Sequence, residues 1–327
     1  MIDRRIFLAS LAALTASRAA GAQPTHKVYR IGILGNAAMA DMAGPEPRTR
    51  SVNALLRGLR EQGYVYGEQF VTEVRGSDGK PERFPRLAAE LVGLQPDVIV
   101  APGTTMRALK QATSTIPIVM AVASDPVGSG YVQSLAHPGG NITGLSDQAI
   151  ETTGKRLELL KELVPPSASV AVLWERLNVQ YWQAAETAAR ERGWRLLSLE
   201  IRDGDDIEAV FKAATDARAG ALLVFAAAHL FQQARRVAEL AARNRLPAMY
   251  ELRAYVEVGR LMSYGADIVE AWRRAAIFVD KILKGAKAAD LAIEQPTKFE
   301  LVINLRTAKA LGLTIPQSLR VQAELIE

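Results

Sequence analysis

The chain has 327 residues, of which 49% are hydrophobic and 23% charged, and its formal net charge is +5. This is the composition of an ordinary globular protein long enough for two cores, and it excludes the low-complexity and disordered classes. The small basic excess is dispersed along the chain, so no nucleic-acid partner is expected. There is no cysteine, which excludes a disulfide framework and a lipid anchor attached through cysteine.

The first 22 residues are predicted to be a signal peptide. Arg4-Arg5 precedes a weakly apolar stretch at residues 6–16, and small residues end in Ala20-Gly21-Ala22 before Gln23. This pattern indicates cleavage near Ala22. Residues 3–8 resemble a twin-arginine signal, with the general secretory route as the alternative. The apolar stretch is too short to span a bilayer comfortably. We therefore expect a soluble protein in the periplasm.

From Tyr29 the sequence alternates apolar runs with segments of helical periodicity, which predicts an α/β fold with parallel sheets. In the first half we predict strands starting at Tyr29 and over residues 70–75, 97–101 and 118–123, with helices over 51–59, over 84–92 and before the last strand. Residues 118–123 are apolar without interruption, which is typical of a strand buried on both faces.

After a link near Gly139-Gly140 the same plan starts again. Strands are predicted over residues 169–174, 194–201, 220–226 and 246–250, with one helix ending at Gly193 and a second running from Ile207. Two copies of one plan predict two similar lobes that face each other across a cleft. The alternative is one large doubly wound sheet, which is disfavoured because the mature chain exceeds the usual size of a single core.

Small and polar residues occur where the predicted strands end. They are Gly35-Asn36, Pro102-Gly103-Thr104-Thr105, Ser124-Asp125, Glu175-Arg176, Ala227-Ala228-His229, Tyr250-Glu251 and Tyr264-Gly265. Ligands of open parallel sheets bind outside the carboxyl ends of the strands. Small residues let a ligand approach the backbone, and a few polar groups orient it. The sequence therefore predicts a binding cleft lined from both lobes.

Asp125 has two compatible interpretations. It could cap a short helix that begins at Pro126, with its side chain accepting a backbone N–H. It could also bind a ligand, because it directly follows a buried strand.

Sequence motifs for catalysis and for cofactors are missing. The chain contains no P-loop, no G-x-G-x-x-G, no G-x-S-x-G and no H-E-x-x-H,. The three histidines, His26, His137 and His229, have no spacing suited to a metal site. We therefore expect no cofactor, no metal and no enzymatic activity.

Five blocks of the sequence carry a resemblance. They are residues 116–128 (IPIVMAVASDPVG), 138–145 (PGGNITGL), 261–265 (LMSYG), 294–305 (EQPTKFELVINL) and 309–316 (KALGLTIP). They resemble the periplasmic substrate-binding proteins of ABC transporters, in the branch that takes up aromatic amino acids. The resemblance covers nearly the whole mature chain, and the blocks occur in the order of that family.

The resemblance implies a type I periplasmic binding protein fold, with two Rossmann-like lobes joined by three crossings and closing as a hinge. The crossings would lie near Gly144, after Gly265 and before Phe299. The first lobe would comprise residues 27–143 and 266–293, and the second residues 144–265 and 294–327. The helix at 268–283 would pack on the first lobe. Its apolar face consists of Ile268, Trp272, Ala276, Val279 and Leu283.

The resemblance also implies a small-molecule ligand, such as an amino acid or a small carboxylate. Asp125 would pair with an ammonium, Thr104 and Thr105 would bind a carboxylate, and Asn178 with residues 227–229 would contribute from the second lobe. Many relatives have Asn-Pro where this chain has Glu175-Arg176, and a polar residue or a carboxylate where it has Ala227-Ala228-His229. These departures weaken the case for an aromatic ligand.

The partners implied by the resemblance are an ABC permease and its ATPase. A periplasmic sensor domain that reports occupancy to a signalling partner is the alternative. A hydrolase or isomerase that uses Asp125, Glu175 or His229 is less favoured, because the sequence offers no nucleophile or metal to work with them.

Overall fold

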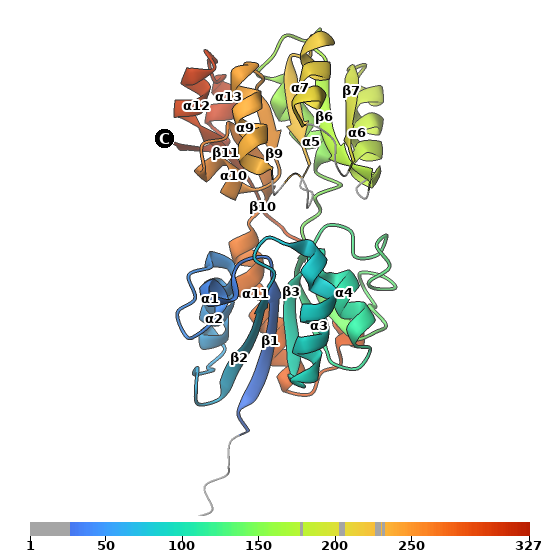
Figure 1. Ribbon diagram of the computed structural model, residues 1–327, viewed down its shortest axis with the longest axis vertical. Coiled ribbons are helices and arrows are strands. Elements are labelled where there is room, and N and C mark those ends of the chain that lie inside the picture. Colours follow the sequence, from blue (N-terminus) through green and yellow to red (C-terminus); the bar gives the residue numbers. More distant parts are fainter. Residues whose placement is uncertain (1–26, 177–178, 203–206, 226–229, 231–232) are drawn as a thin grey trace, which may run out of the picture.

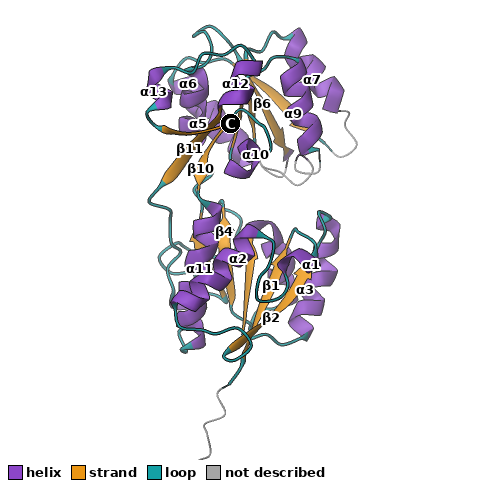
Figure 2. Ribbon diagram, turned by 90° about the vertical axis from the view of Figure 1, so that its left-hand side faces the viewer, coloured by secondary structure: helices purple, strands orange, loops and turns teal. Residues whose placement is uncertain are grey.

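The computed structural model describes residues 27–176, 179–202, 207–225, 230 and 233–327. The predicted signal peptide lies outside these residues. The described chain forms two lobes stacked end to end (Figure 1). Each lobe is a sheet with helices on both of its faces (Figure 2). Within the described ranges, every helix is too short or too polar to cross a membrane.

The first lobe contains a five-stranded parallel sheet in the order β2-β1-β3-β4-β5. Its strands are β1 (Tyr29–Gly35), β2 (Phe70–Gly76), β3 (Val98–Pro102), β4 (Ile118–Ala123) and β5 (Ile142–Ser146). The helices beside it are α1 (Met39–Met42), α2 (Arg50–Glu61), α3 (Phe84–Gly93), α4 (Met106–Ala112) and α11 (Ile268–Leu283).

Strand β4 shows how this sheet is buried. Val119 and Ala121 pack in one apolar cluster with α2 and α11, while Ile118 and Met120 pack in a second cluster with α3 and α4. Successive strand residues point to opposite faces, so a strand covered on both sides must be apolar throughout. The prediction for residues 118–123 is confirmed in both its limits and its burial.

The second lobe contains a seven-stranded sheet in the order β12-β11-β10-β9-β8-β6-β7. Its strands are β6 (Val170–Glu175), β7 (Leu196–Ile201), β8 (Ala221–Val224), β9 (Ala248–Tyr250), β10 (Met262–Ala266), β11 (Phe299–Asn304) and β12 (Ala323–Ile326). Its helices are α5 (Thr153–Lys161), α6 (Val179–Glu191), α7 (Ile207–Asp216), α9 (Ala234–Arg243), α10 (Arg253–Glu257), α12 (Leu305–Ala310) and α13 (Gln317–Arg320). Only the β10–β11 pair is antiparallel among the described strand pairs. Two separate sheets are present, so the alternative of one large sheet is wrong.

Three connections join the lobes. The first follows Ser146 at the end of β5, the second is Asp267 between β10 and α11, and the third lies between Glu294 and Phe299. The first and third run side by side, because the backbone N–H of Ser146 donates to the carbonyl of Glu294 over 2.8 Å. Strand β5 is not predicted from the sequence. It adds a fifth strand to the first sheet after the link that the sequence places near Gly139-Gly140.

Helix α11 returns the chain to the first lobe. Asp267 caps it by accepting the backbone N–H of Glu270 over 3.0 Å, which fixes its start. Trp272, Ala276 and Val279 are buried against the five-stranded sheet and α2, with Ile268 and Leu283 partly buried beside them. The apolar face predicted for this segment is therefore the face that packs on the first lobe.

Gly58 allows α2 and α11 to approach closely. A Cβ atom at this position would lie 2.2 Å from the backbone carbonyl oxygen of Arg273 and 2.8 Å from the Ala276 side chain. Neither neighbour is the end of a flexible side chain, so any larger residue would force the helices apart.

Candidate functional site

The ends of several strands in the first lobe face the second lobe. Strand β1 runs toward the junction between the lobes (Figure 1), and β3 and β4 run parallel to it. The loops that follow these three strands contain five residues that the sequence predicts to lie in the site, Asn36, Thr104, Thr105, Ser124 and Asp125. The structure therefore brings the predicted residues of the first lobe to one edge of its sheet.

A pocket of about 670 Å³ lies between the lobes at this edge. Most of its lining comes from α4 and from the segment after β4, and Gln180 at the start of α6 contributes from the second lobe. The lining residues are Arg107, Lys110, Gln111, Asp125, Gly128, Ser129, Tyr131 and Gln180. The lining is polar and contains charges of both signs.

Asp125 lines this pocket and also holds the backbone beside it. Its Oδ1 accepts the backbone N–H of Gly128 over 2.7 Å. A Cβ atom at position 128 would lie 1.9 Å from Asp125 Oδ2, so only glycine leaves room for the carboxylate. The predicted capping bond exists, but the predicted helix does not. Residues 126–130 form turns, because two glycines in five residues disfavour a helix and Tyr131 N–H returns to the Pro126 carbonyl over 2.9 Å.

The two threonines differ in their surroundings. Thr105 is fully buried, and its hydroxyl donates to the Pro102 carbonyl over 2.8 Å. Thr104 is exposed. Asn36 is also exposed, and its backbone carbonyl accepts the N–H of Gly79 over 2.8 Å. Thr105 thus has its hydroxyl proton committed within the first lobe.

A buried polar cluster lies where the chain first crosses between the lobes. Ser124, at the end of β4, donates its hydroxyl to Asp147 Oδ2 over 3.3 Å. Asp147 Oδ1 accepts the backbone N–H of Ala149 over 3.0 Å. The Ser124 hydroxyl also lowers the pKa of the Tyr181 hydroxyl on α6, against the larger effect of burial. The end of a first-lobe strand is therefore hydrogen-bonded to the crossing and lies close to a second-lobe helix.

Arg156 provides the cation of the cluster and is only 1% exposed. Its Nε donates to the Tyr264 carbonyl and its Nη1 to the Ala149 carbonyl, each over 2.7 Å. The same Nη1 lies 3.6 Å from Glu251 Oε1, and Glu251 is 4% exposed. A buried charge is tolerated when it is paired and hydrogen-bonded, and Arg156 meets both conditions.

Burial dominates the titration of this cluster. It raises the pKa of the Asp147 carboxyl above its ordinary value, against the opposing effects of the Ala149 N–H, the Arg156 charge and the Ser124 hydroxyl. Burial also raises the pKa of the Tyr181 hydroxyl well above its usual range, and the charges of Glu251 and Asp147 add to this. The cluster therefore holds its tyrosine neutral.

The remaining candidate site residues of the second lobe lie in different surroundings. Glu251 belongs to the buried cluster, whereas Tyr250 is 2% exposed and packs against Tyr255, 5.4 Å between ring centroids, in the core beside α9. Glu175 Oε1 accepts the Leu230 backbone N–H over 3.0 Å. Asn178, Ala228 and His229 lie outside the described residues.

Sequence reasoning missed Arg107, Asp147, Arg156, Gln180 and Tyr181. Asp147 follows a strand end and could have been found by the same rule as Asp125, had β5 been predicted. The other four lie on helices, where the sequence carries no signal that separates a cleft residue from a surface one.

Across the ranges that the structure describes, no group of three or more potential metal ligands occurs.

Comparison with known proteins gives one family and several relatives. The family model described as ABC transporter substrate binding protein matches residues 41–326. The tyrosine-binding protein of Clostridioides difficile is 24% identical over 268 residues, which are 81% of this chain and 77% of that protein. The family match is far more extensive than any single motif.

Two solved structures resemble the whole described architecture. A conserved domain protein from Vibrio cholerae matches with a TM-score of 0.82 and 26% identity, over 92% of this chain and 100% of that one. An ABC domain in complex with L-Trp from Streptococcus pneumonia matches with a TM-score of 0.80 and 24% identity, over the same shares of the two chains. Both likenesses extend across both lobes.

Proposed function

The chain belongs to the ABC transporter substrate-binding protein family, and from that membership we propose that its ligand is an aromatic amino acid bound between the lobes. As a member of the family it is a solute receptor for an ABC transporter, and its fold is that of the type I periplasmic binding proteins. The tyrosine-binding relative and the structure in complex with L-Trp support the class of ligand.

The pocket between the lobes is the observation that carries this proposal. It contains two cationic side chains and one carboxylate, and its volume of about 670 Å³ lies in the usual range of small-molecule sites, about 300–1,000 Å³. A zwitterionic head group requires partners of both signs once water leaves the site, because an unpaired buried charge is costly. The sequence departures at Glu175-Arg176 do not alter this lining, because neither residue belongs to it.

The wider setting of the protein follows from the same proposal. The mature chain would start near Gln23, work in the periplasm and deliver its ligand to an ABC permease with its ATPase. The first lobe would comprise residues 27–143 with 266–293, and the second residues 144–265 with 294–327. The boundary at 143 would move to Ser146, so that β5 stays whole in the first lobe, and the boundary at 265 would move to Ala266, so that β10 stays whole in the second. Closure about the three connections would trap the ligand.

A thermal-shift screen of the twenty common amino acids tests the proposal. A ligand that binds only the folded state at one hundred times its Kd stabilises it by about 2.7 kcal/mol. L-tyrosine or L-tryptophan should raise the melting temperature and reduce the radius of gyration in X-ray scattering. A screen in which no aromatic amino acid shifts the melting temperature would disprove the proposed ligand class.

A further inference from the structure

Three charged side chains surround the pocket without forming ion pairs among the described residues. Arg107 and Lys110 lie one helical turn apart on α4, and Asp125 lies on the segment after β4. In the described part of the chain, no acidic side chain is within ion-pair distance of Arg107 or Lys110, and no basic one is within that distance of Asp125. The pocket therefore presents separate positive and negative groups to an incoming molecule.

The two cations are not equivalent. Lys110 Nζ donates to the backbone carbonyl of Gly130, so part of its hydrogen-bonding capacity is used within the first lobe. The guanidinium of Arg107 lies near enough to Tyr131 for its charge to lower the pKa of the phenol, against the larger opposite effect of burial. A guanidinium offers several donors in a planar fork that matches a carboxylate. Arg107 is thus the better-suited partner for an acid group.

Asp125 provides the opposite charge. Its Oδ1 accepts the Gly128 N–H, which fixes the orientation of the carboxylate and leaves Oδ2 without a hydrogen bond from the described residues. A carboxylate held in place by a backbone donor binds a cation without first losing side-chain freedom. The same bond makes Asp125 a rigid acceptor at the pocket edge.

We propose that this pocket receives the head group of an α-amino acid, with Arg107 binding the ligand carboxylate and Asp125 binding its ammonium. The assignment rests on the proposed function and deepens it. It moves the carboxylate contact away from Thr105, whose hydroxyl already donates to Pro102. Gln180 lies on the opposite lobe, so closure brings an amide to the same head group.

The test dissects the ligand and the protein together. L-tyrosine carries both the ammonium and the carboxylate. Tyramine carries only the ammonium, and 3-(4-hydroxyphenyl)propionate carries only the carboxylate. Their affinities are measured by calorimetry, with displacement of bound L-tyrosine for weak probes, in the wild type, Arg107→Gln and Asp125→Asn. The tryptophan series replaces the tyrosine series if L-tryptophan is the tighter ligand. Arg60→Gln is the matched control, because Arg60 is exposed on α2 and does not line the pocket.

Arg107→Gln should weaken L-tyrosine and the propionate by about tenfold or more, because a charge pair loses one partner, and should leave tyramine within about twofold of wild type. Asp125→Asn should weaken L-tyrosine and tyramine and spare the propionate. Equal losses for all three probes, or losses no larger than those of Arg60→Gln, would overturn the assignment while leaving the receptor function intact. A wild type that binds no amino acid would instead refute the proposed function, and this inference with it.

Discussion

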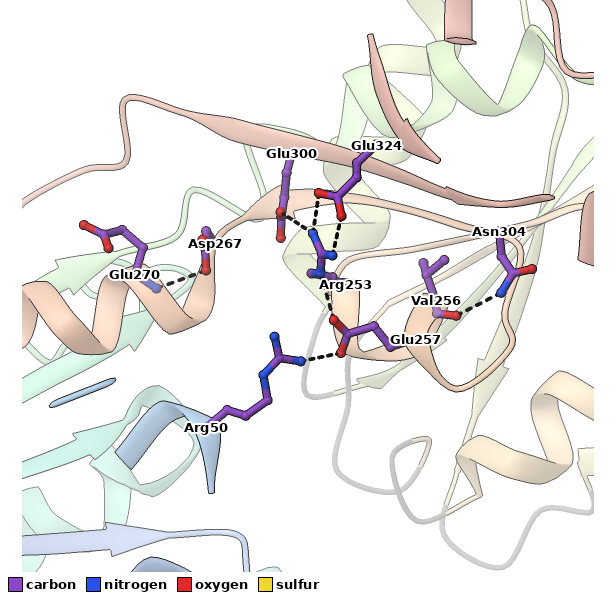
Figure 3. Close-up of polar contacts among 9 residues, drawn as sticks. All are labelled: Arg50, Arg253, Val256, Glu257, Asp267, Glu270, Glu300, Asn304 and Glu324. Atoms are coloured by element: carbon purple, nitrogen blue, oxygen red, sulfur yellow. Dashed lines mark hydrogen bonds and ion pairs between the residues drawn. The ribbon is translucent and has the colours of Figure 1, made fainter. Parts of the chain in front are cut away.

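Arg50 Nη1 lies 2.7 Å from Glu257 Oε2, and this ion pair joins the start of α2 in the first lobe to the end of α10 in the second (Figure 3). Neither residue belongs to the three connections between the lobes. Glu257 is held in turn by Arg253 Nε over 2.8 Å, and Arg253 also contacts Glu324 on the last strand. The pair therefore links the first lobe to a network of ion pairs around Arg253 in the second.

Arg50→Gln should loosen this link without affecting either core. Arg50 is 66% exposed, and exposed pairs contribute about 0.2–1 kcal/mol, so ligand affinity should fall by at most about fivefold. The loss should disappear near 1 M salt, where the Debye length is about 3 Å. Calorimetry at low and high salt measures both effects.

Arg48→Gln is the control for that experiment, because Arg48 pairs with Asp41 inside the first lobe. It should leave both affinity and salt dependence at wild-type values. If Arg50→Gln behaved like Arg48→Gln at low salt, the Arg50–Glu257 pair would have no part in closure.

Asp147→Asn should change how stability depends on pH. The folded-state pKa of Asp147 is raised above its ordinary value of 3.8 by burial, so the folded state binds the proton more tightly than the unfolded chain. The ionised carboxylate thus destabilises the wild type above the raised pKa, and this cost is relieved as pH falls through the raised pKa toward 3.8. The melting temperature of the wild type should rise relative to Asp147→Asn over that interval. Parallel curves from neutral pH down to pH 4 would contradict the shift.

Arg156→Met should be strongly destabilising. It removes the cation that lies 3.6 Å from Glu251, and it takes one donor from the Tyr264 carbonyl and one from the Ala149 carbonyl. Breaking a buried charge pair by removing one partner costs about 3–5 kcal/mol. Urea unfolding followed by circular dichroism gives the value. Arg176→Gln provides the comparison, since Arg176 is 81% exposed and 3.8 Å from Glu200, and its cost should stay below about 0.5 kcal/mol.

Gly58→Ala should destabilise the first lobe even though alanine is the better helix former. The added methyl meets the Arg273 carbonyl oxygen at 2.2 Å, and overpacking of this kind costs about 1–3 kcal/mol. Gly93 ends helix α3 with no atom within 4 Å of the added Cβ, so Gly93→Ala should be neutral or stabilising. The pair of melting temperatures separates the steric effect from helix propensity, and equal shifts would disprove the close approach.

The order of strands and helices could be predicted from sequence because burial acts on it directly. Strands covered on both faces are apolar throughout, and helices that cover them are apolar on one side. The sequence does not predict strand β5, because Pro138-Gly139-Gly140 before it and Gly144 within it indicate a loop. Asp147 is therefore not predicted as a site residue, since a residue is recognised as following a strand only when the strand itself is predicted.

The site was predicted at the level of strand ends and no further. Asp125 and Ser124 were chosen because they follow β4, and the structure places both near the junction of the lobes. Arg107 and Gln180 reach the same pocket from α4 and α6. Their positions depend on how the lobes face each other, and local periodicity does not report that arrangement. Arg156 was hidden for a related reason, because a buried arginine within a helix looks like a surface residue in sequence.

The return of α11 to the first lobe sets the order in which the protein can fold during synthesis. The first sheet is complete at Ser146, but the face that Trp272 and Phe278 cover stays open until α11 has left the ribosome, after strands β6 to β10 of the second lobe. Such long-range contacts slow folding and expose apolar surface in the nascent chain. The first lobe therefore cannot finish folding before five strands of the second have been made, and its open apolar face is prone to aggregation until α11 docks,.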